Sequence, residues 1–493
     1  MGKVTVPPEV LWGASTQRAV GNFPISGRPL PAPFLRALGL VKLAAAKANG
    51  DLGRLAPGKS RLIQQAAREI ANGGHAAQFP VDVFQTGSGT STNTNINEVI
   101  AHLAAAMAGE ADGTAPPVHP NDEVNLGQSS NDVIPTALHV SVALVLHRDL
   151  APALKTLATT LEGKAGEFAT IVKLGRTHLM DATPLTLGQE FSGYARQVRK
   201  AGDRVQRAIA ALGELAIGGT AVGTGLNAHR DFAGQVCRIL SRETGLAFHE
   251  AKNHFEAQAA RDDCVEVAGV LVAVAASLTK IANDLRLLAS GPRAGLGELR
   301  LPSVQPGSSI MPGKSNPVLC EMLVQVGLYA QGLAQTVMAC GREGQLELNA
   351  TLPLIAHCLH EAVRCLANGA RVFADNCVAG IEADAGRCRQ YTEQSLMLIT
   401  ALTPLIGYDV AASVAQEALA GGKSLREVVL SRRLLDPATL DRTLEPLAMT
   451  GSAGGGEKHP TPAEQVMENE GGHVVDAGQS GKPATAVAVT TRE

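Results

Sequence analysis

The strongest constraint on the fold is a set of long apolar segments in the second and third quarters of the chain. They span residues 187–211, 259–288, 318–338 and 354–378. Each greatly exceeds the usual helix of ~11–12 residues, and several are apolar on nearly all sides. Strand-like alternation is scarce. Such helices must be buried on most sides, so the pattern predicts a mainly α-helical (all-α) fold with a central bundle of long helices that packs against further copies of the chain.

Turn residues and composition divide the chain into three predicted folded parts and a tail. The predicted parts are a mixed N-terminal domain (1–135), a central long-helix bundle (136–353), a small helical C-terminal domain (354–450) and a tail (451–493). The tail contains Gly454-Gly455-Gly456 and no aromatic residue. It buries too little apolar surface to offset its ordering entropy, so it is predicted to be disordered. In the central part, residues 137–172 predict a nearly continuous helix with a break or kink at Pro152.

Composition excludes several classes of function. With 43 basic and 46 acidic side chains the formal net charge is −3, and no basic block indicates nucleic-acid binding. The eight cysteines all lie beyond residue 230 without a CxxC pair, which predicts reduced thiols and neither a disulfide framework nor a zinc ribbon. The N-terminus lacks the apolar segment of a signal peptide, and the apolar run 267–278 is short for a membrane span. We therefore expect a cytoplasmic protein with neither nucleic-acid nor membrane partners.

Four polar segments interrupt this apolar chain and carry most of its candidate chemistry. Hydroxyls, amides and backbone N–H groups beside glycine suit the binding of carboxylate oxygens, and a helix N-terminus adds to the attraction. Asn95 and Glu98 are predicted to form a capping box where a helix opens. Any one such segment is more often a turn or a cap, and composition alone indicates only a site for a small polar anion. The segments are 86–95, 119–132, 175–178 and 306–317.

The literal strings in these segments resemble a known family. Gly307-Ser308-Ser309-Ile310-Met311-Pro312-Gly313-Lys314-Ser315-Asn316-Pro317 resembles the fumarase/aspartase signature G-S-S-x-M-P-x-K-x-N-P, and the resemblance extends over residues 6–449. Within that superfamily, Thr86-Gly87-Ser88-Gly89-Thr90, His119-Pro120-Asn121-Asp122 and Gly175-Arg176-Thr177-His178 are most similar to class II fumarases. Residues 292–296 and 344–349 are closer in character to aspartases.

The resemblance implies a lyase without a cofactor. The expected reaction is the reversible anti-addition of water to fumarate, giving L-malate through an aci-carboxylate carbanion, a step of the tricarboxylic acid cycle. The alternatives are an aspartate ammonia-lyase and a non-catalytic descendant of the family. The family is homotetrameric, with each active site built from loops of three subunits, so the resemblance implies the same here.

The same resemblance assigns roles to individual residues. Ser308 is the implied base, with its alkoxide stabilised by Lys314 and by backbone N–H groups of the loop. His178 acts as the acid through a water molecule and is oriented by Glu321. Ser315 and Met180 depart from the residues common at these positions in the family. The implied substrate-binding residues are Ser88, Gly89, Thr90, Ser129, Ser130, Asn131, Thr177, Ser309, Lys314, Ser315 and Asn316.

Three further patterns carry smaller expectations. His119, Pro120, Asn121 and Asp122 match a second dicarboxylate site of the family, which Pro116 is expected to weaken because some fumarases have arginine there. Residues 357–361 contain two histidines and a glutamate at helical spacing, but no second ligand cluster accompanies them, so no metal site is predicted. The glycine-rich run 218–225 lacks the lysine of a phosphate-binding loop, and the resemblance implies a loop near the active site.

Overall fold

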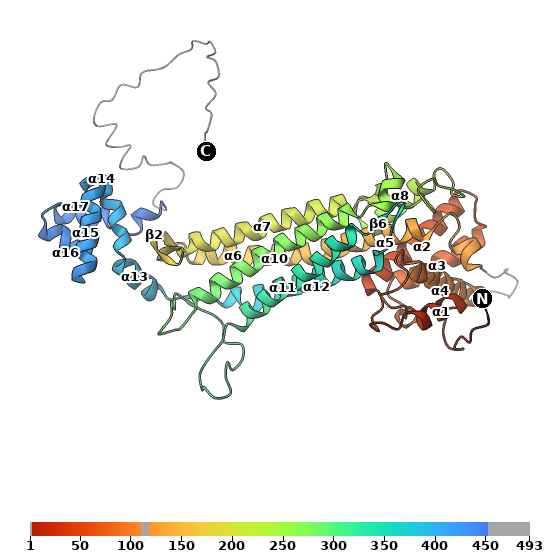
Figure 1. The fold of residues 1–493 in the computed structure, drawn as a ribbon, viewed down its shortest axis with the longest axis horizontal. Helices are drawn as coiled ribbons and strands as arrows, with labels where there is room; N and C mark the ends of the chain where they lie inside the picture. The colour runs from red at the N-terminus through yellow and green to blue at the C-terminus, as the bar shows by residue number, and fades with distance from the viewer. Residues whose placement is uncertain (1, 110–117, 452–493) are drawn as a thin grey trace, which may run out of the picture. The chain divides into compact units, whose positions relative to one another are not determined.

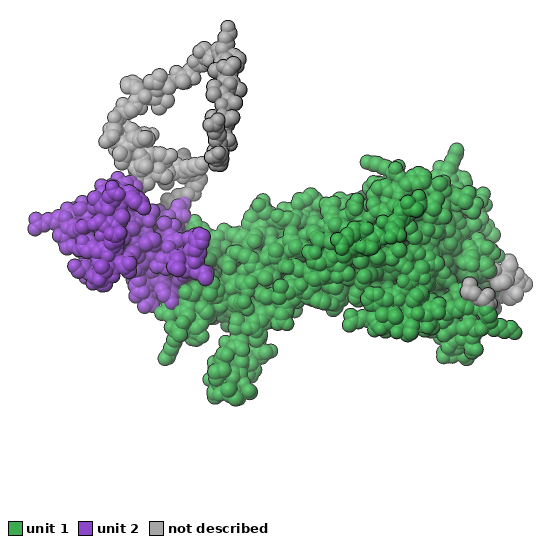
Figure 2. Space-filling model, in the orientation of Figure 1, with its two compact units in different colours: residues 1–169, 187–387 green, residues 170–186, 388–493 purple. Residues whose placement is uncertain are grey.

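The computed structural model describes residues 2–109 and 118–451. The chain forms two compact units, which are described separately (Figure 2). Unit 1 comprises residues 1–169 and 187–387, and unit 2 comprises residues 170–186 and 388–493. The finer three-part division expected from composition stays a prediction, and residues 452–493 of the expected tail lie outside the described part.

Short and medium helices form one end of unit 1 (Figure 1). They are α1 (Ala14–Asn22), α2 (Ala32–Asp51), α3 (Pro57–Ala71), α4 (Thr90–Gly109), the π-helical turn η2 (Pro120–Val124) and α5 (Ser130–Val145). The predicted helix start at Asn95 is wrong, because α4 begins five residues earlier at Thr90. Glu98 instead reaches another helix: its carboxylate accepts the backbone N–H groups of Gly13, Ser15 and Thr16 at 2.8–3.2 Å. It thereby satisfies the free donors at the N-terminus of α1.

Long helices make up the rest of unit 1 and confirm the mainly helical prediction. They are α6 (Ala151–Glu167), α7 (Leu187–Ala211), α10 (Asp262–Leu288), α11 (Val318–Gly341) and α12 (Leu352–Asn376). α7 packs against α6 and α10, and α11 packs against α10 and α12 (Figure 1). The bounds of α7, α10, α11 and α12 lie within three residues of the four predicted apolar segments, because the length of an apolar run sets the length of the buried helix.

The break predicted at Pro152 takes the form of a π-helical turn. η3 (Leu146–Leu150) joins α5 to α6 without interrupting the helical path, and Pro152 lies in the first turn of α6. Because Pro152 has no N–H, it removes one hydrogen bond from this continuous helical path, and the π-helical turn directly precedes it. The helix ends at Glu167 rather than at residue 172.

Small elements connect the helices of unit 1. The remaining helices are the 3-10 helix η1 (Ala76–Gln78), α8 (Phe232–Thr244), α9 (His254–Ala259) and the 3-10 helix η4 (Val378–Gly380). Strands β3 (Glu214–Leu215) and β4 (His249–Glu250) pair in parallel. Strands β5 (Leu299–Arg300) with β8 (Glu382–Ala383), and β6 (Gly344–Gln345) with β7 (Leu348–Asn349), pair antiparallel.

Unit 2 combines a β-hairpin with short C-terminal helices. The hairpin pairs β1 (Val172–Thr177) with β2 (Met180–Thr186), and β2 packs against the 3-10 helix η5 (Leu396–Leu402). Leu402, Val414, Val428 and Leu440 are fully buried in its apolar core. The helices are α13 (Ala385–Gln394), which begins in unit 1, then η5 (Leu396–Leu402), α14 (Thr403–Ile406), α15 (Tyr408–Gly421), α16 (Leu425–Ser431), α17 (Pro437–Thr443) and η6 (Ala448–Thr450).

Two helical stretches of the described chain are long and apolar enough to cross a membrane by length and composition alone. They are Ser130–Glu167, with 78% of its apolar window buried within the chain, and Asp262–Leu288, with 44%. The run 267–278 judged too short in the sequence is therefore part of a 27-residue helix. Core helices of soluble proteins pass the same test, and both stretches pack in the helical bundle of unit 1.

Two buried histidines make the fold sensitive to acid. Burial lowers the pKa of His139 to about 3 and that of His360 to about 4. The unfolded chain protonates both near pH 6.5, so stability is complete above that pH and falls as the pH drops toward the folded values. Each contributes roughly 1.4 kcal/mol per pH unit in this window. Burial raises the pKa of Asp132 to about 6, so this carboxyl binds its proton more tightly in the folded chain and stabilises the fold as the pH drops. This single group offsets only part of the stability that the two histidines remove.

Substitution of a histidine tests whether that residue causes the dependence of stability on pH. We expect the melting temperature to fall between pH 6.5 and pH 4.5, and His360→Leu to make that fall shallower. His147→Leu is the matched control, because His147 is exposed and should keep the full slope. Thermal melts across this range measure both, and an unchanged slope in His360→Leu would contradict the assignment.

Candidate active site

The signature loop before α11 is folded back on itself. The backbone N–H of Gly307 donates to the carbonyl of Lys314 at 2.8 Å, and Asn316 Nδ2 donates to the carbonyl of Gly307 at 2.8 Å. A Cβ on Gly307 would lie 2.6 Å from the Lys314 carbonyl oxygen, so this crossing requires glycine. Asn316 therefore helps to close the loop in the single chain.

Ser308 occupies an electrostatically favourable position in this loop. Its Oγ accepts the backbone N–H groups of Ile310 and Met311, both at 3.2 Å. Two donors aimed at one hydroxyl oxygen stabilise negative charge on it, as an oxyanion hole does. Stabilisation of an alkoxide at Ser308 stays a prediction, and these two N–H groups are the donors that it would use.

The other polar residues of the loop face solvent in the single chain. Ser309, Lys314 and Ser315 are exposed, and Ser315 Oγ donates to Ser303 Oγ at 3.1 Å. The Lys314 ammonium has no ion-pair partner among the described residues. Glu321 lies in the first turn of α11. These groups are available to a ligand or to another polypeptide chain.

The loop before α4 presents hydroxyls at a helix N-terminus. Ser88 Oγ and Thr90 Oγ1 are hydrogen-bonded at 2.9 Å, and Thr90 is the first residue of α4. Gly89 between them is buried with φ +75°, a conformation that favours glycine. The arrangement suits a carboxylate, because the helix end adds unpaired N–H groups to the two hydroxyls.

A second helix N-terminus lies beside the first. Ser129 caps α5 in a capping box with Asp132, and its Oγ accepts the N–H of Asn131 at 3.2 Å. Asn93 of α4 donates to Ser130 Oγ at 3.1 Å, which ties this loop to the helix that follows Ser88 and Thr90. The structure therefore brings together the predicted residues of the 88–90 and 129–131 segments.

Asp132 is the residue of this cluster that sequence reasoning missed. It is fully buried, and its carboxylate accepts the backbone N–H groups of Ser129, Gly218 and Thr220 at 2.8–3.0 Å. It thus joins the 129–131 segment to the glycine-rich run 218–225, and Asn131 Nδ2 adds a bond to the Ala221 carbonyl at 2.8 Å. The signal in the sequence was the Ser-x-x-Asp spacing of a capping box at Ser129.

The predicted loop at residues 175–178 is instead part of a hairpin. Gly175, Arg176 and Thr177 end strand β1, and His178 and Leu179 form the turn with φ +56° and +62°. Left-handed backbone is uncommon for non-glycine residues and marks a constrained turn. Thr177 and His178 are both exposed, so their side chains are free to meet a ligand.

The signature loop and the two helix N-termini lie at opposite ends of unit 1. Asn316 shares a small cavity with Cys377, at the end of α12, whereas Leu352, at the start of α12, donates its N–H to the Gly87 carbonyl at 2.9 Å. α12 has 25 residues, so the two groups are separated by roughly 37 Å. One chain therefore does not bring Ser308 to Ser88 or Asn131.

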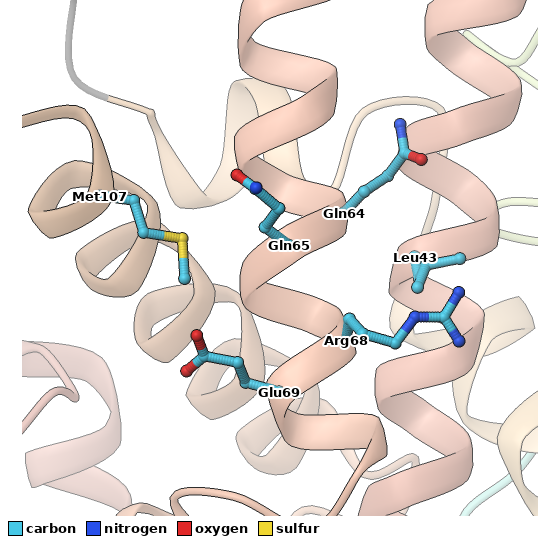
Figure 3. A pocket seen from close by; sticks show the side chains of 6 residues that line it. All are labelled: Leu43, Gln64, Gln65, Arg68, Glu69 and Met107. Atoms are coloured by element: carbon cyan, nitrogen blue, oxygen red, sulfur yellow. The ribbon is translucent and has the colours of Figure 1, made fainter. Parts of the chain in front are cut away.

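The groove in Figure 3 contains none of these candidate residues. It lies between α2, α3 and α4 and is lined by Leu43, Gln64, Gln65, Arg68, Glu69 and Met107. The Arg68 guanidinium is already paired with the Glu243 carboxylate at 2.5 and 2.9 Å. The groove therefore offers no free cation for a dicarboxylate.

The predicted second dicarboxylate site is an exposed turn. His119 Nδ1 accepts the N–H of Asp122 at 3.1 Å and lies 3.0 Å from its carboxylate, and Pro120 and Asn121 form the π-helical turn between them. Asp122 is 80% exposed. Binding here stays a prediction, and Pro116 lies outside the described residues.

Groups that could hold a metal ion are absent from the described residues. At the pattern in 357–361, His360 is buried with Nδ1 against the Ala356 carbonyl at 2.8 Å, and Glu361 pairs with Arg364. All eight cysteines are free thiols, seven of them buried.

Gly87 gives a test of how tightly the 86–90 loop is held. A Cβ at this position would lie 1.8 Å from the Ala350 carbonyl oxygen, a contact that no side chain tolerates. We expect Gly87→Ala to displace the loop and destabilise the fold by roughly 3 kcal/mol or more. Gly163→Ala on α6 is the control: nothing lies within 4 Å, so it should stabilise by about 0.5–1 kcal/mol. Urea denaturation measures both, and equal effects would contradict the close contact.

Comparison with known proteins agrees with these features. The family described as Lyase matches residues 2–332, and the family described as Fumarase C C-terminus matches residues 398–451. Fumarate hydratase class II of Corynebacterium efficiens is 52% identical over 92% of this chain and 95% of its own length. The Mycobacterium tuberculosis enzyme of that name is also 52% identical, over 91% and 94%.

A solved structure extends the similarity to the fold. The crystal structure of class II fumarase from Schistosoma mansoni matches with a TM-score of 0.89 and 40% identity, covering 92% of this chain and 98% of that one. A relative 52% identical over nearly its full length shows the family. The chain therefore belongs to the class II fumarate hydratases of the fumarase/aspartase superfamily.

Proposed function

We propose that this chain catalyses the reversible hydration of fumarate to L-malate, the step of the tricarboxylic acid cycle that its relatives' names describe. The observation that carries the proposal is 52% identity to class II fumarate hydratases over 92% of the chain. The two N–H groups that donate to Ser308 Oγ also support it. The reaction needs a base strong enough to remove a C–H proton, and a serine hydroxyl becomes one only if its alkoxide is stabilised.

The proposed role of the signature loop is described for the elimination of water from L-malate. Ser308, as alkoxide, removes the proton from the carbon beside one carboxylate of L-malate. The carbanion is held as an aci-carboxylate, whose second negative charge is offset by Lys314 and Asn316. Ser309 and Ser315 line the same loop, and we propose that they contact this carboxylate.

The hydroxyl leaves from the opposite face with an acid partner. We propose that His178 delivers the proton through a water molecule and that Glu321 orients the imidazole. Thr177 would contact the leaving hydroxyl. The exposed turn holding His178 supports this role, since its imidazole remains open to a water and a ligand.

The other carboxylate is assigned to the paired helix N-termini. The hydroxyls and N–H groups of Ser88, Gly89 and Thr90 lie beside those of Ser129, Ser130 and Asn131, and Asn93 links the two loops. Two neighbouring helix N-termini favour the binding of a carboxylate.

We also propose that the active protein is a homotetramer with active sites shared between subunits. The separation of Ser308 from the 88–90 and 129–131 loops by the length of α12 supports this, because a small dicarboxylate cannot span it. Leu328 and Tyr329 on α11 are 60% and 47% exposed, and less than half of the apolar window of α10 is buried in one chain. Long helices with exposed apolar faces fit a bundle shared by several copies. We place the enzyme in the cytoplasm.

One absorbance experiment separates this function from its alternatives. Fumarate absorbs in the ultraviolet, so its appearance is followed with L-malate and then with L-aspartate as substrate. We expect fumarate from L-malate only. Fumarate from L-aspartate alone would make the chain an ammonia-lyase, and none from either would favour a non-catalytic descendant.

A further inference from the structure

Lys42 is a buried lysine beneath the paired helix N-termini. It lies on α2 with no exposed surface, and its Nζ donates to Asn125 Oδ1 at 2.9 Å and to Gln128 Oε1 at 3.0 Å. A buried ammonium is costly unless hydrogen-bonded or paired, so a lysine here needs these two acceptors. Lys42 belongs to no segment that the sequence singled out.

The two acceptors shape the loop that leads to Ser129. Asn125 Nδ2 donates to the Gln128 carbonyl at 3.1 Å. Gln128 Nε2 donates to the carbonyls of Val124 and Leu126 at 3.1 and 3.2 Å. The Asn125 and Gln128 side chains thus bond to the backbone of the 124–128 turn, and Lys42 bonds to both of these side chains. Together these bonds hold Ser129 in its position as the cap of α5.

The same network reaches Ser130. Asn125 Oδ1 also accepts from Asn93 Nδ2 at 3.2 Å, and Asn93 Nδ2 donates to Ser130 Oγ at 3.1 Å. Lys42 is therefore two side chains away from a hydroxyl assigned to the substrate carboxylate. Its hydrogen bonds in the described structure go to Asn125 and Gln128 and not to Ser129, Ser130 or Asn131.

The positive charge of Lys42 also affects the electrostatics of the 129–131 loop. Asp132 is a buried carboxylate one residue beyond Asn131, and its negative charge disfavours an anion at the same helix N-terminus. Burial lowers the pKa of Lys42 to about 7, and the charge of Asp132 acts in the opposite direction to keep the ammonium protonated. A protonated Lys42 offsets the Asp132 charge and leaves the helix dipole of α5 to attract the ligand.

We propose that Lys42 is a positioning residue for the carboxylate site at 129–131: it holds the 124–128 turn and balances the charge of Asp132, without touching the substrate. The proposal rests on the proposed function, because it assigns the 129–131 loop to a substrate carboxylate. Its contribution is to binding in the ground and transition states alike, so removing it should raise KM more than it lowers kcat.

The primary test is Lys42→Met, which keeps the length of the side chain and removes its donors and charge. We expect the KM for fumarate to rise by about tenfold or more, since two buried acceptors lose their partner, while kcat changes by less than about threefold. Lys47→Met is the matched control on the same helix. The Lys47 side chain is 37% exposed and pairs with Asp51 at 3.1 Å among the described residues, so the KM of this variant should equal that of the wild type.

A second variant and a double variant separate positioning from general destabilisation. Gln128→Met removes one acceptor and keeps the lysine, so it should raise KM in the same direction even if Lys42→Met fails to fold. If Lys42→Met folds, the KM increase in the double variant should be smaller than the product of the two single increases, because both changes remove the same Lys42–Gln128 contact. Independent damage to the fold would instead multiply the two effects.

Equilibrium binding provides a readout apart from turnover. Titration calorimetry with succinate, a dicarboxylate that lacks the reacting double bond, should show weaker binding in Lys42→Met and Gln128→Met but not in Lys47→Met. Wild-type affinity in both site variants, with an active wild-type enzyme, would overturn the positioning role. A wild-type protein inactive with L-malate would overturn the proposed function instead, so the two failures are distinguishable.

Discussion

Ser308→Ala should lower kcat by roughly a thousandfold or more, because a general base typically contributes 10²–10⁴-fold. Ser308 Oγ is the hydroxyl that accepts the N–H groups of Ile310 and Met311 in the described structure. The two N–H groups of Ile310 and Met311 point at the Ser308 oxygen and would be left without an acceptor. Steady-state turnover of L-malate measures the loss, and the KM should change much less, since the carboxylate contacts remain.

Ser309→Ala is the neighbouring control. Ser309 is exposed and accepts neither of these N–H bonds, so its loss should affect binding and leave most of the turnover. Near-normal turnover in Ser308→Ala, or an equal loss in both variants, would reject Ser308 as the base.

Asp132→Ala should be the most damaging substitution outside the catalytic loop. It leaves three backbone N–H groups without their acceptor: that of Thr220, which is buried, and those of Ser129 and Gly218, which are part-buried. At roughly 1–3 kcal/mol for each unsatisfied buried group, the free energy of unfolding should fall by about 3–5 kcal/mol or more. Activity should fall by at least about a hundredfold, because the 129–131 and 218–220 segments lose the carboxylate that joins them.

The control is Asp51→Ala, which removes a carboxylate that is 52% exposed and paired with Lys47. Exposed pairs contribute at most about 1 kcal/mol, so its stability and activity should remain near those of the wild type. Chemical denaturation and turnover measure the pair of variants side by side. Comparable stability in Asp132→Ala and Asp51→Ala would show that the buried carboxylate does not hold the two loops.

The long helices could be predicted from the sequence because a continuous apolar run is buried as one helix, so its ends mark the ends of the helix. α7 has the predicted bounds, and α10, α11 and α12 differ from theirs by at most three residues. The signature loop was also recognisable, since its chemistry is carried by consecutive residues around Ser308.

Contacts between distant segments were not readable in this way. Glu98 was taken as a local cap, yet it caps α1 from more than 80 residues away. Lys42 gave no sign of its role, because its partners lie in another element. The capping-box spacing at Ser129 indicated only the local bond of Asp132 and not its bonds to Gly218 and Thr220. The hairpin at Thr177 was missed since strand pairing depends on β2, which a local pattern does not reveal.

The central claim is that Ser308 of one subunit works with the carboxylate loops of another. Its most direct measurement mixes two inactive variants, Ser308→Ala and Asn131→Leu, by co-expression or by dissociation and reassociation. In random hybrids each shared site receives an intact Ser308 and an intact Asn131 from different subunits in about a quarter of cases, so about a quarter of wild-type activity should return. Each variant alone should remain inactive. No recovery in hybrids that are shown to form would mean that one chain supplies both residues, against the separation of the two loops by the length of α12.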